Sequence, residues 1–324
     1  MPKKRNNKKT NKILISLVVS ILIIIVLLLC GKNEQAQKYF ENLIGINISS
    51  QNTETNKIKS TQIDSEDGIK TIVVGENNSN KTNENIENLK VYYIDVGQAD
   101  SILIMNNGES ALIDAGNNED GQDVVNFIKS KGITKLNYVI GTHPHEDHIG
   151  GLDDVINNID IDKIYLPKIQ TTTKTYQDVL TAIQNKNKTI TTFKKGDKFS
   201  IGEANSEIMT DSISDKNNLN LSSNIIRMEY NKTSFLFTGD AETENEKAIE
   251  WSQTDILKVG HHGSKTSTSQ KFLNQIKPTY AIISVGKDND YGHPNKETLD
   301  KLKNIGAQVI RTDESGTIEI IVTK

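Results

Sequence analysis

All six histidines of the 324-residue sequence lie in three short segments. Along the chain they are grouped as three, two and one: His143, His145 and His148; His261 and His262; and His293. Imidazole is a common ligand of borderline divalent metals and the side chain that most readily exchanges a proton near neutral pH. The grouping therefore indicates one site, assembled from distant parts of the chain, that performs metal-dependent or acid–base chemistry.

The first histidine segment has the spacing of a metal site, since residues 142–148 read Thr-His-Pro-His-Glu-Asp-His. In an extended loop the side chains of His143 and His145 point the same way, because the period is two. Asp147 and His148 lie where the chain turns toward a helix predicted over 152–157, so they can face the same cavity from another direction. Two imidazoles on one side, and a carboxylate plus an imidazole on the other, suit a pair of adjacent ions better than a solvated polar turn.

The elements that must position these residues alternate between strand and helix. Three short β-rich runs cover 89–96, 100–105 and 110–116, with turn residues such as Asn106-Asn107-Gly108 between them. Apolar periodicity then predicts further strands over 136–140, 163–166, 224–230, 234–238, 256–259, 281–285 and 308–311. Helices are predicted over 120–131, 152–157, 176–184, 242–250, 269–276 and 296–304. Residues 88–324 are therefore expected to form one α/β domain, a mixed sheet sandwich covered by helices rather than a purely parallel sheet.

The N-terminal part predicts a membrane anchor. Residues 13–29 are apolar and uncharged, and with Cys30 they would form a helix of roughly 27 Å, close to the thickness of a hydrocarbon core. The basic segment 1–12 should stay cytoplasmic, which makes 13–30 a single-pass anchor and places the rest of the chain outside the cell. A cleaved secretory signal is the alternative, and it exports the domain as well. Lipidation of Cys30 is disfavoured because Leu29 precedes it, where a small residue is expected.

Composition narrows the class of protein further. Residues 31–87 are rich in polar residues and poor in aromatics, so they are expected to be a largely disordered linker. Cys30 is the only cysteine, which leaves the exported part without a disulfide framework or a thiolate nucleophile. Six of the 38 basic residues lie within 1–12, and the remaining 32 stand against 42 acidic residues, a net charge of −10. That balance disfavours a broad nucleic-acid-binding surface, and no segment indicates a protein partner.

The pattern H-x-H-x-D-H is the signature of the metallo-β-lactamase superfamily. The domain resembles the soluble hydrolase domain of ComEC-type competence proteins and their free-standing relatives. The matching segments run in the family's order: Ile94 to Gln98, Ile113 to Gly116, Thr238 to Glu242, Lys258 to Ser264 and Tyr291 to Pro294. The resemblance implies the αββα sandwich of that superfamily.

The resemblance also implies a site for two divalent ions, zinc by default with manganese as the alternative. It implies six metal ligands: His143, His145, Asp147, His148, Asp240 and His262. The first two would hold one ion, the next two the other, and Asp240, which emerges after Gly239 at the end of a strand, would bridge them. The turn at 260–263 cannot aim both of its imidazoles alike, so His262 is favoured as the ligand, with His261 behind it or at the substrate. Asp147, His261 and His293 are the catalytic candidates, and His293 would bind substrate oxyanions or protonate a leaving group.

One departure from the family leaves the number of ions open. Many members supply a further histidine from the middle of the domain, but this sequence has none between His148 and His261 and instead has an Asn/Ser-rich segment at 217–224. The first ion would then be weakly held, or a single ion tightly bound. Asp95, Gln98 and Asp100 are expected to accept the second N–H of ligand histidines. Flanking lysines, Lys258 and Lys265, would either attract an anion or be ordinary solvated side chains.

The predicted reaction is hydrolysis by a metal-activated hydroxide, which needs no protein nucleophile and fits a chain without a Gly-x-Ser-x-Gly elbow. Phosphodiester cleavage is preferred because ComEC-type domains are thought to act on nucleic-acid strands, so an anionic phosphodiester such as DNA is the expected substrate. Two alternatives stay open. One is a surface phosphorylcholine or teichoic-acid esterase, and the other is a non-catalytic metal-binding surface module.

Overall fold

The computed structural model describes residues 60–64, 69–75 and 88–324. The predicted basic segment 1–12 and the predicted anchor 13–30 lie outside these residues. Within the described ranges, none of the helices combines the length and the apolar character that crossing a membrane requires.

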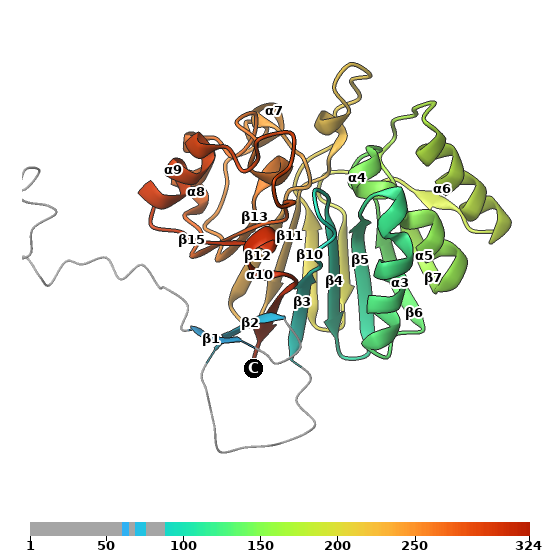
Figure 1. Cartoon of the computed structure of the whole chain (residues 1–324), viewed down its shortest axis with the longest axis horizontal. Helices are drawn as coiled ribbons and strands as arrows, with labels where there is room; N and C mark the ends of the chain where they lie inside the picture. The colour runs from blue at the N-terminus through green and yellow to red at the C-terminus, as the bar shows by residue number, and fades with distance from the viewer. Residues whose placement is uncertain (1–59, 65–68, 76–87) are drawn as a thin grey trace, which may run out of the picture. The chain divides into compact units, whose positions relative to one another are not determined.

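Two mixed sheets carry the domain (Figure 1). The first sheet has nine strands in this order: β1 (Ser60–Asp64), β2 (Lys70–Val74), β16 (Ile318–Val322), β3 (Leu89–Tyr93), β4 (Ser101–Asn106), β5 (Glu109–Ala115), β6 (Lys135–Ile140), β7 (Asp160–Tyr165) and β8 (Ile190–Thr191). The second has seven: β15 (Gln308–Arg311), β14 (Tyr280–Ile283), β13 (Ile256–Lys258), β12 (Thr233–Phe237), β11 (Ile226–Tyr230), β10 (Ala204–Ile208) and β9 (Lys198–Ile201). Both contain parallel and antiparallel pairs, so the predicted mixed sandwich is confirmed.

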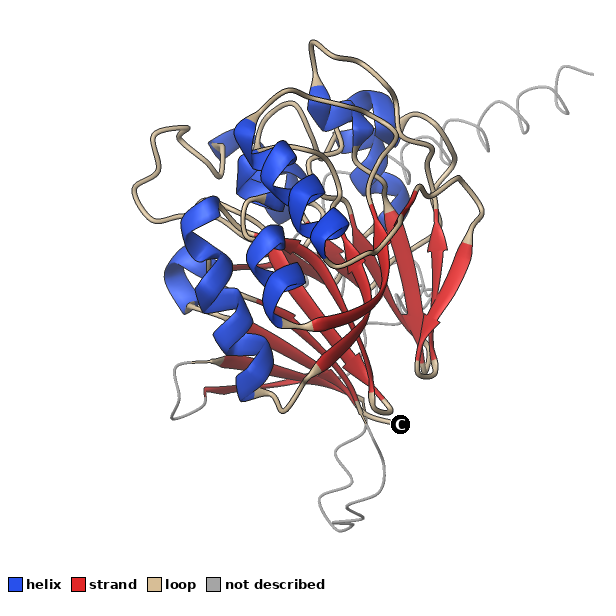
Figure 2. Cartoon of the chain, turned by 90° about the vertical axis from the view of Figure 1, so that its right-hand side faces the viewer, coloured by secondary structure: helices blue, strands red, loops and turns tan. Residues whose placement is uncertain are grey.

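Helices cover the outer face of each sheet (Figure 2). The first sheet carries α3 (Gly121–Ser130), α4 (Glu146–Ile149), α5 (Leu152–Asn158) and α6 (Lys174–Asn185), and the second carries α7 (Thr243–Glu246), α8 (Gln270–Ile276) and α9 (Lys296–Asn304). A short helix, α10 (Thr312–Ser315), precedes β16. The layers therefore run helix, sheet, sheet, helix, which confirms the αββα arrangement.

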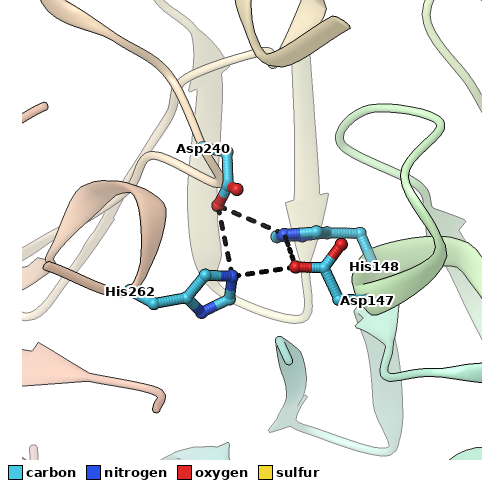
Figure 3. Close-up of side chains that lie close together, drawn as sticks. All are labelled: Asp147, His148, Asp240 and His262. Atoms are coloured by element: carbon cyan, nitrogen blue, oxygen red, sulfur yellow. Dashed lines mark hydrogen bonds and ion pairs between the residues drawn. The ribbon is translucent and has the colours of Figure 1, made fainter. Parts of the chain in front are cut away.

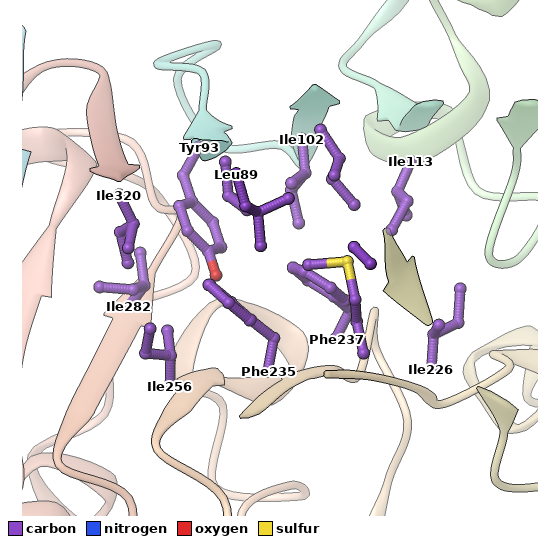
Figure 4. Packing of buried hydrophobic residues seen from close by; sticks show 14 of the residues in the cluster. Leu89, Tyr93, Ile102, Ile113, Ile226, Phe235, Phe237, Ile256, Ile282 and Ile320 are labelled. Carbon is purple, nitrogen blue, oxygen red and sulfur yellow. The ribbon is translucent and has the colours of Figure 1, made fainter. Parts of the chain in front are cut away.

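The apolar runs of the strands follow from burial on both faces. Val91 and Tyr93 point into the core between the sheets, whereas Tyr92 packs against the helices. Phe235 and Phe237 of the second sheet lie in the same core as Tyr93 (Figure 4). Leu236, between them, packs in the cluster under the helices of the second sheet. Because successive strand residues alternate in direction, such strands must be apolar almost throughout.

Local chemistry explains where two of the predictions succeed and fail. Asn107 and Gly108 both have positive φ, 50° and 75°, as a two-residue hairpin between β4 and β5 requires. The helix predicted over 242–250 is wrong beyond its first turn, because α7 ends at Glu246. The indole N–H of Trp251 donates to the Glu246 carbonyl at 2.6 Å, which removes the acceptor that the next helical turn would use.

The predicted linker, 31–87, contains two strands and is corrected there. β2 pairs in parallel with β16, and Ile72 and Val74 are buried in the core between the sheets. The run Lys70 to Val74 supplies enough apolar surface to join the sheet, although the residues around it are polar. The sheet of the domain therefore includes a segment that lies before residue 88.

Parallel strands bring the functional loops to one end of the sandwich. β5, β6 and β7 are parallel neighbours in the first sheet, as are β12, β13, β14 and β15 in the second. The carboxyl ends of parallel strands lie at the same edge, so the loops that follow them are neighbours. The three histidine segments and Asp240 all follow strands of these two groups.

Candidate metal centre

Three loops meet through one glycine. Gly239 has φ of 49°, and a Cβ there would lie 2.9 Å from Thr142 Oγ1, so a side chain at this position would be both strained and too close. The loop after β12 therefore packs against the loop after β6. The His261 backbone N–H donates to the Gly239 carbonyl at 3.1 Å, which ties in the loop after β13. The predicted convergence of distant segments has its physical origin here.

Four side chains form a compact group: Asp147, His148, Asp240 and His262 (Figure 3). His148 Nε2 lies 3.2 Å from Asp240 Oδ1 and 3.7 Å from Asp147 Oδ2. His262 Nε2 lies 3.2 Å from Asp147 Oδ2 and 3.7 Å from Asp240 Oδ1. For metal–ligand bonds of about 2.1 Å, the edges of a tetrahedron are about 3.4 Å long. These four distances match the edges of such a tetrahedron, and all the donors lie within 4.8 Å of one another, as a single cation requires.

Two buried atoms without hydrogen bonds support this fit. His148 Nε2 and Asp240 Oδ1 are buried and 3.2 Å apart, yet neither makes a hydrogen bond to any residue that the structure describes. Buried polar atoms are almost always hydrogen-bonded, so two that lie this close without a hydrogen bond mark a place for an additional group. A divalent cation satisfies both atoms at once.

A second donor set lies on the other side of Asp240. His143 Nε2 is 3.8 Å from Asp240 Oδ2 and 2.9 Å from His145 Nδ1. Asp240 thus directs Oδ1 toward the compact group and Oδ2 toward the His143 pair, as a bridging carboxylate would. His143 and His145 themselves lie outside the compact group.

The electrostatics of the compact group are those of a site that attracts cations. Burial alone would raise the pKa of Asp147 and Asp240, but the neighbouring imidazoles outweigh it and hold both values below their usual range. Burial would lower the pKa of His148 and His262, but nearby carboxylates, Asp240 foremost, raise both. Without a cation, protons on the imidazoles balance the carboxylates, and a bound cation would replace them.

The structure identifies the residues that orient the imidazoles. His148 Nδ1 donates to Asp114 Oδ2 at 2.8 Å, and Asp114 also accepts the backbone N–H and the hydroxyl of Thr142. His262 Nδ1 donates to the Ser284 carbonyl at 2.9 Å. In both rings Nε2 is thereby aimed at the centre, the usual arrangement for metal-binding histidines. Asp114 was not among the predicted supporting residues, although it lies in the matching segment Ile113 to Gly116 and near the end of the largely buried strand β5.

Of the three residues predicted to accept a hydrogen bond from a ligand histidine, only one lies next to a histidine of the site. Asp95 is exposed and accepts from its own neighbour, Gly97, so the expectation that it holds a histidine is wrong. Gln98 lines the site, but its Oε1 accepts from Gly286 N. Asp100 Oδ1 does approach His262 Nδ1, at 3.4 Å. Asp100 is therefore the member of the predicted trio that lies behind a site histidine.

Lys258 occupies a different place from the one expected. It is fully buried, and its Nζ lies 2.6 Å from Asp100 Oδ2, so it is neither a solvated lysine nor free to attract an anion. A lysine is tolerated in this otherwise apolar run because Asp100 and the Val259 carbonyl accept hydrogen bonds from its ammonium group. Lys265, in contrast, is exposed.

A cavity of about 310 Å³ opens onto the centre. Its lining includes the carboxylates and both catalytic candidates from the later loops: Gln98, His145, Glu146, Asp147, Asp240, His261, His262, Tyr291 and His293. Burial, with the charges of His261 and His262, lowers the pKa of His293 to about 4. His293 is therefore neutral at pH 7, which favours hydrogen bonding to substrate over protonation of a leaving group.

Comparison with known proteins agrees with this geometry. The model of the Metallo-beta-lactamase superfamily matches residues 94–287. ComE operon protein 3 of Bacillus subtilis is 32% identical over 252 residues, covering 71% of this chain and 32% of that protein. Recombination protein 2 of Haemophilus influenzae is 30% identical over 234 residues, covering 70% and 28%. The chain thus spans about a third of the length of these curated relatives. Among solved structures, the metallo-beta-lactamase fold protein YhfI from Bacillus subtilis shares the fold, with a TM-score of 0.50 and 12% identity over 72% of this chain and 99% of that one.

Proposed function

Since the chain belongs to the metallo-beta-lactamase superfamily, we propose that it is a metal-dependent hydrolase and that it cleaves phosphodiester bonds. The observation that carries the proposal is the compact group of two imidazoles and two carboxylates, spaced for one cation, next to a second donor pair and an open cavity. Fold alone would not support it, because this fold serves many reactions.

Each side chain then has a defined task. Divalent ions bound there would supply an activated water as the nucleophile and would polarise the bond that is attacked. Asp147, His148 and His262 would hold one ion, and Asp240 would bridge it to a second. The donors are imidazole and carboxylate, which suits zinc and also accommodates manganese. Neutral His293 at the cavity would donate or accept a hydrogen bond at a substrate oxygen.

Two observations favour a nucleic-acid phosphodiester over other substrates. The relative Recombination protein 2 is named for recombination, a process in which DNA is handled. Tyr291, which is 74% exposed, lines the cavity and stacks on the ring of His293. An exposed aromatic ring beside the reacting centre suits a base of a single strand, which any aromatic face can stack on.

The placement of the enzyme in the cell is part of the proposal. Residues 13–30, which lie outside the described residues, would anchor the chain in the membrane and keep the hydrolase on the outer side. The substrate would then be an extracellular or periplasmic polyanion.

The proposal is tested with the purified full chain. Its metal content is measured first, and then the hydrolysis of bis(p-nitrophenyl) phosphate is followed before and after chelation. We expect bound metal, a loss of turnover on chelation and its return when metal is added back. The variant Asp240→Asn should lose activity by about 100-fold or more, because loss of even an outer partner of a metal ligand costs 10- to 100-fold. Asp162→Asn, a surface change, is the matched control.

Three further substrates separate the remaining alternatives: single-stranded DNA, a phosphorylcholine ester and a cephalosporin. Cleavage of the phosphorylcholine ester alone would favour a surface esterase, and cleavage of the cephalosporin alone would contradict the phosphodiester assignment. Bound metal without turnover of any substrate would instead favour the non-catalytic binding module.

A further inference from the structure

We infer that His261 is a ligand of the first ion, completing the donor set to which His143, His145 and Asp240 belong. The inference rests on the proposed function, since it concerns the ions of the same site. It assigns the fourth donor to the loop after β13, although the chain offers no histidine between His148 and His261.

The two oxygens of Asp240 divide the surrounding imidazoles into two sets. Oδ1 lies nearest to His148 and His262, the imidazoles of the compact group. Oδ2 lies 3.8 Å from His143 Nε2 and 3.6 Å from His261 Nε2. His261 is therefore related to Oδ2 as His262 is related to Oδ1. Adjacent histidines of one turn thus serve opposite sides of the bridging carboxylate.

The ring of His261 is held as a ligand ring would be. Its Nδ1 lies 3.2 Å from Thr266 Oγ1, 3.3 Å from Asn220 Nδ2 and 3.8 Å from Glu242 Oε1. These contacts orient the ring so that Nε2 is directed to the side of Asp240 Oδ2. Such fixation of the far nitrogen is typical of metal-binding histidines.

The backbone of the turn is shaped to aim both rings. His261 and His262 adopt left-handed conformations with φ of 51° and 50°. Left-handed backbone is strained for residues other than glycine, and strain of this kind is concentrated at functional sites. The left-handed pair turns successive side chains toward different oxygens of the same carboxylate.

The Asn/Ser-rich segment 217–224 contains no histidine, but its side chains contact His261 and Glu242. Asn220, in the short helix η3 (Leu219–Ser222), contacts His261 Nδ1 through its amide at 3.3 Å, and Asn218 donates to Glu242 Oε2 at 2.8 Å. This segment packs against the outer side of the His261 ring, opposite Asp240. Its role is to position the ligand.

The donors of the first set are ordered as a chain: His145, His143, Asp240 and His261. His143 and Asp240 in the middle are fully buried, whereas His145 and His261 at the ends are partly exposed, His261 to 23%. The ends border the cavity, where their rings have room to close around an ion. The first position therefore opens onto the cavity where substrate would bind.

The test compares metal binding by the full-length wild type, His261→Gly and His293→Ala. Glycine is chosen because position 261 has positive φ, which glycine adopts without strain, so the variant should fold at least as well as the wild type. We expect two ions per chain in the wild type and in His293→Ala, and one tightly bound ion in His261→Gly. The affinity for the lost ion should fall by about tenfold or more, since changes merely next to a ligand already have that effect.

The readout is metal stoichiometry after dialysis, with Mn²⁺ paramagnetic resonance as a second measure: the coupled signal of an ion pair should give way to that of an isolated ion. Free imidazole should restore the second ion to His261→Gly. If the wild type and His261→Gly both retain two ions with equal affinity, His261 is no ligand and the hydrolase proposal stands. If the wild type binds one ion, the inference fails. If it binds none, the proposed function itself fails.

Discussion

Replacing Lys258 by methionine tests whether the charge network behind the metal centre is as desolvated as the structure indicates. Lys258 is fully buried and Asp100 is 1% exposed, and the two charges are 2.6 Å apart. Methionine fills nearly the same volume but leaves the Asp100 carboxylate without its counter-charge. Asp100 Oδ1 makes no hydrogen bond to any described residue, and its neighbour His262 Nδ1, 3.4 Å away, already donates to the Ser284 carbonyl.

The expected loss of stability follows from the cost of an unpaired buried charge. At an effective dielectric constant of about 20, charges this close attract each other by roughly 6 kcal/mol, much of which offsets their desolvation. Removing one partner of such a pair typically destabilises a protein by about 3–5 kcal/mol. For a domain of this size, that corresponds to a decrease in Tm of roughly 6–20 °C.

The assay is thermal unfolding of the metal-free full chain, followed by circular dichroism. Lys135→Met is the matched control, because it removes a lysine from an ion pair of similar length, 2.8 Å, whose side chains are 49% and 41% exposed. Exposed pairs of this kind contribute little, so its Tm should not change measurably. The double variant Lys258→Met/Asp100→Asn should recover most of the loss. Equal Tm values for Lys258→Met and Lys135→Met would refute the reasoning.

Two further predictions concern the histidines of the compact group. Asp114→Asn keeps the size of the side chain but weakens the acceptor for His148 Nδ1, so metal affinity should fall by about 10- to 100-fold, and calorimetric titration with unchanged affinity would contradict this. The pKa values of His148 and His262 are raised in the fold, so the stability they contribute is fully present below their unfolded value of about 6.5 and is lost as pH rises through the raised values. The Tm of the metal-free protein should therefore decrease as the pH rises above about 6.5, whereas His143 and His145, with lowered pKa values, act only below that pH. If the Tm of the metal-free protein did not change with pH, the imidazoles would carry no protons that balance the charges of the carboxylates.

Sequence reasoning located the site because its chemistry is local. The segment 142–148 and the adjacent histidines at 261 and 262 each indicate metal ligands within a few residues. The apolar run before each segment predicts a strand, so each segment is expected at the end of a strand. Parallel pairing then determines that the loops share an edge. The fold layers could be predicted for the same reason, since strands buried on both faces are apolar almost throughout.

What could not be predicted depends on contacts between distant residues. Asp95 and Asp114 both lie near the ends of β-rich runs, and only the tertiary structure shows that Asp114 faces His148 whereas Asp95 faces solvent. Lys258 is a polar residue whose burial depends on Asp100, more than 150 positions away. The hairpin of β9 and β10 was missed because half of its residues are polar, as an edge position in the sheet permits.

The position of β16 has a consequence for how the domain folds. Ile318 pairs with Tyr93, 225 positions earlier, and with Lys70 on its other side. Pairings this remote are slow to form, because a long loop must close before any contact rewards it. Until β16 inserts, β2 and β3 present open edges to each other and to other chains, a state prone to aggregation. A truncated chain that ends before residue 318, and so lacks β16, should therefore be insoluble even though every residue of the metal centre is still present.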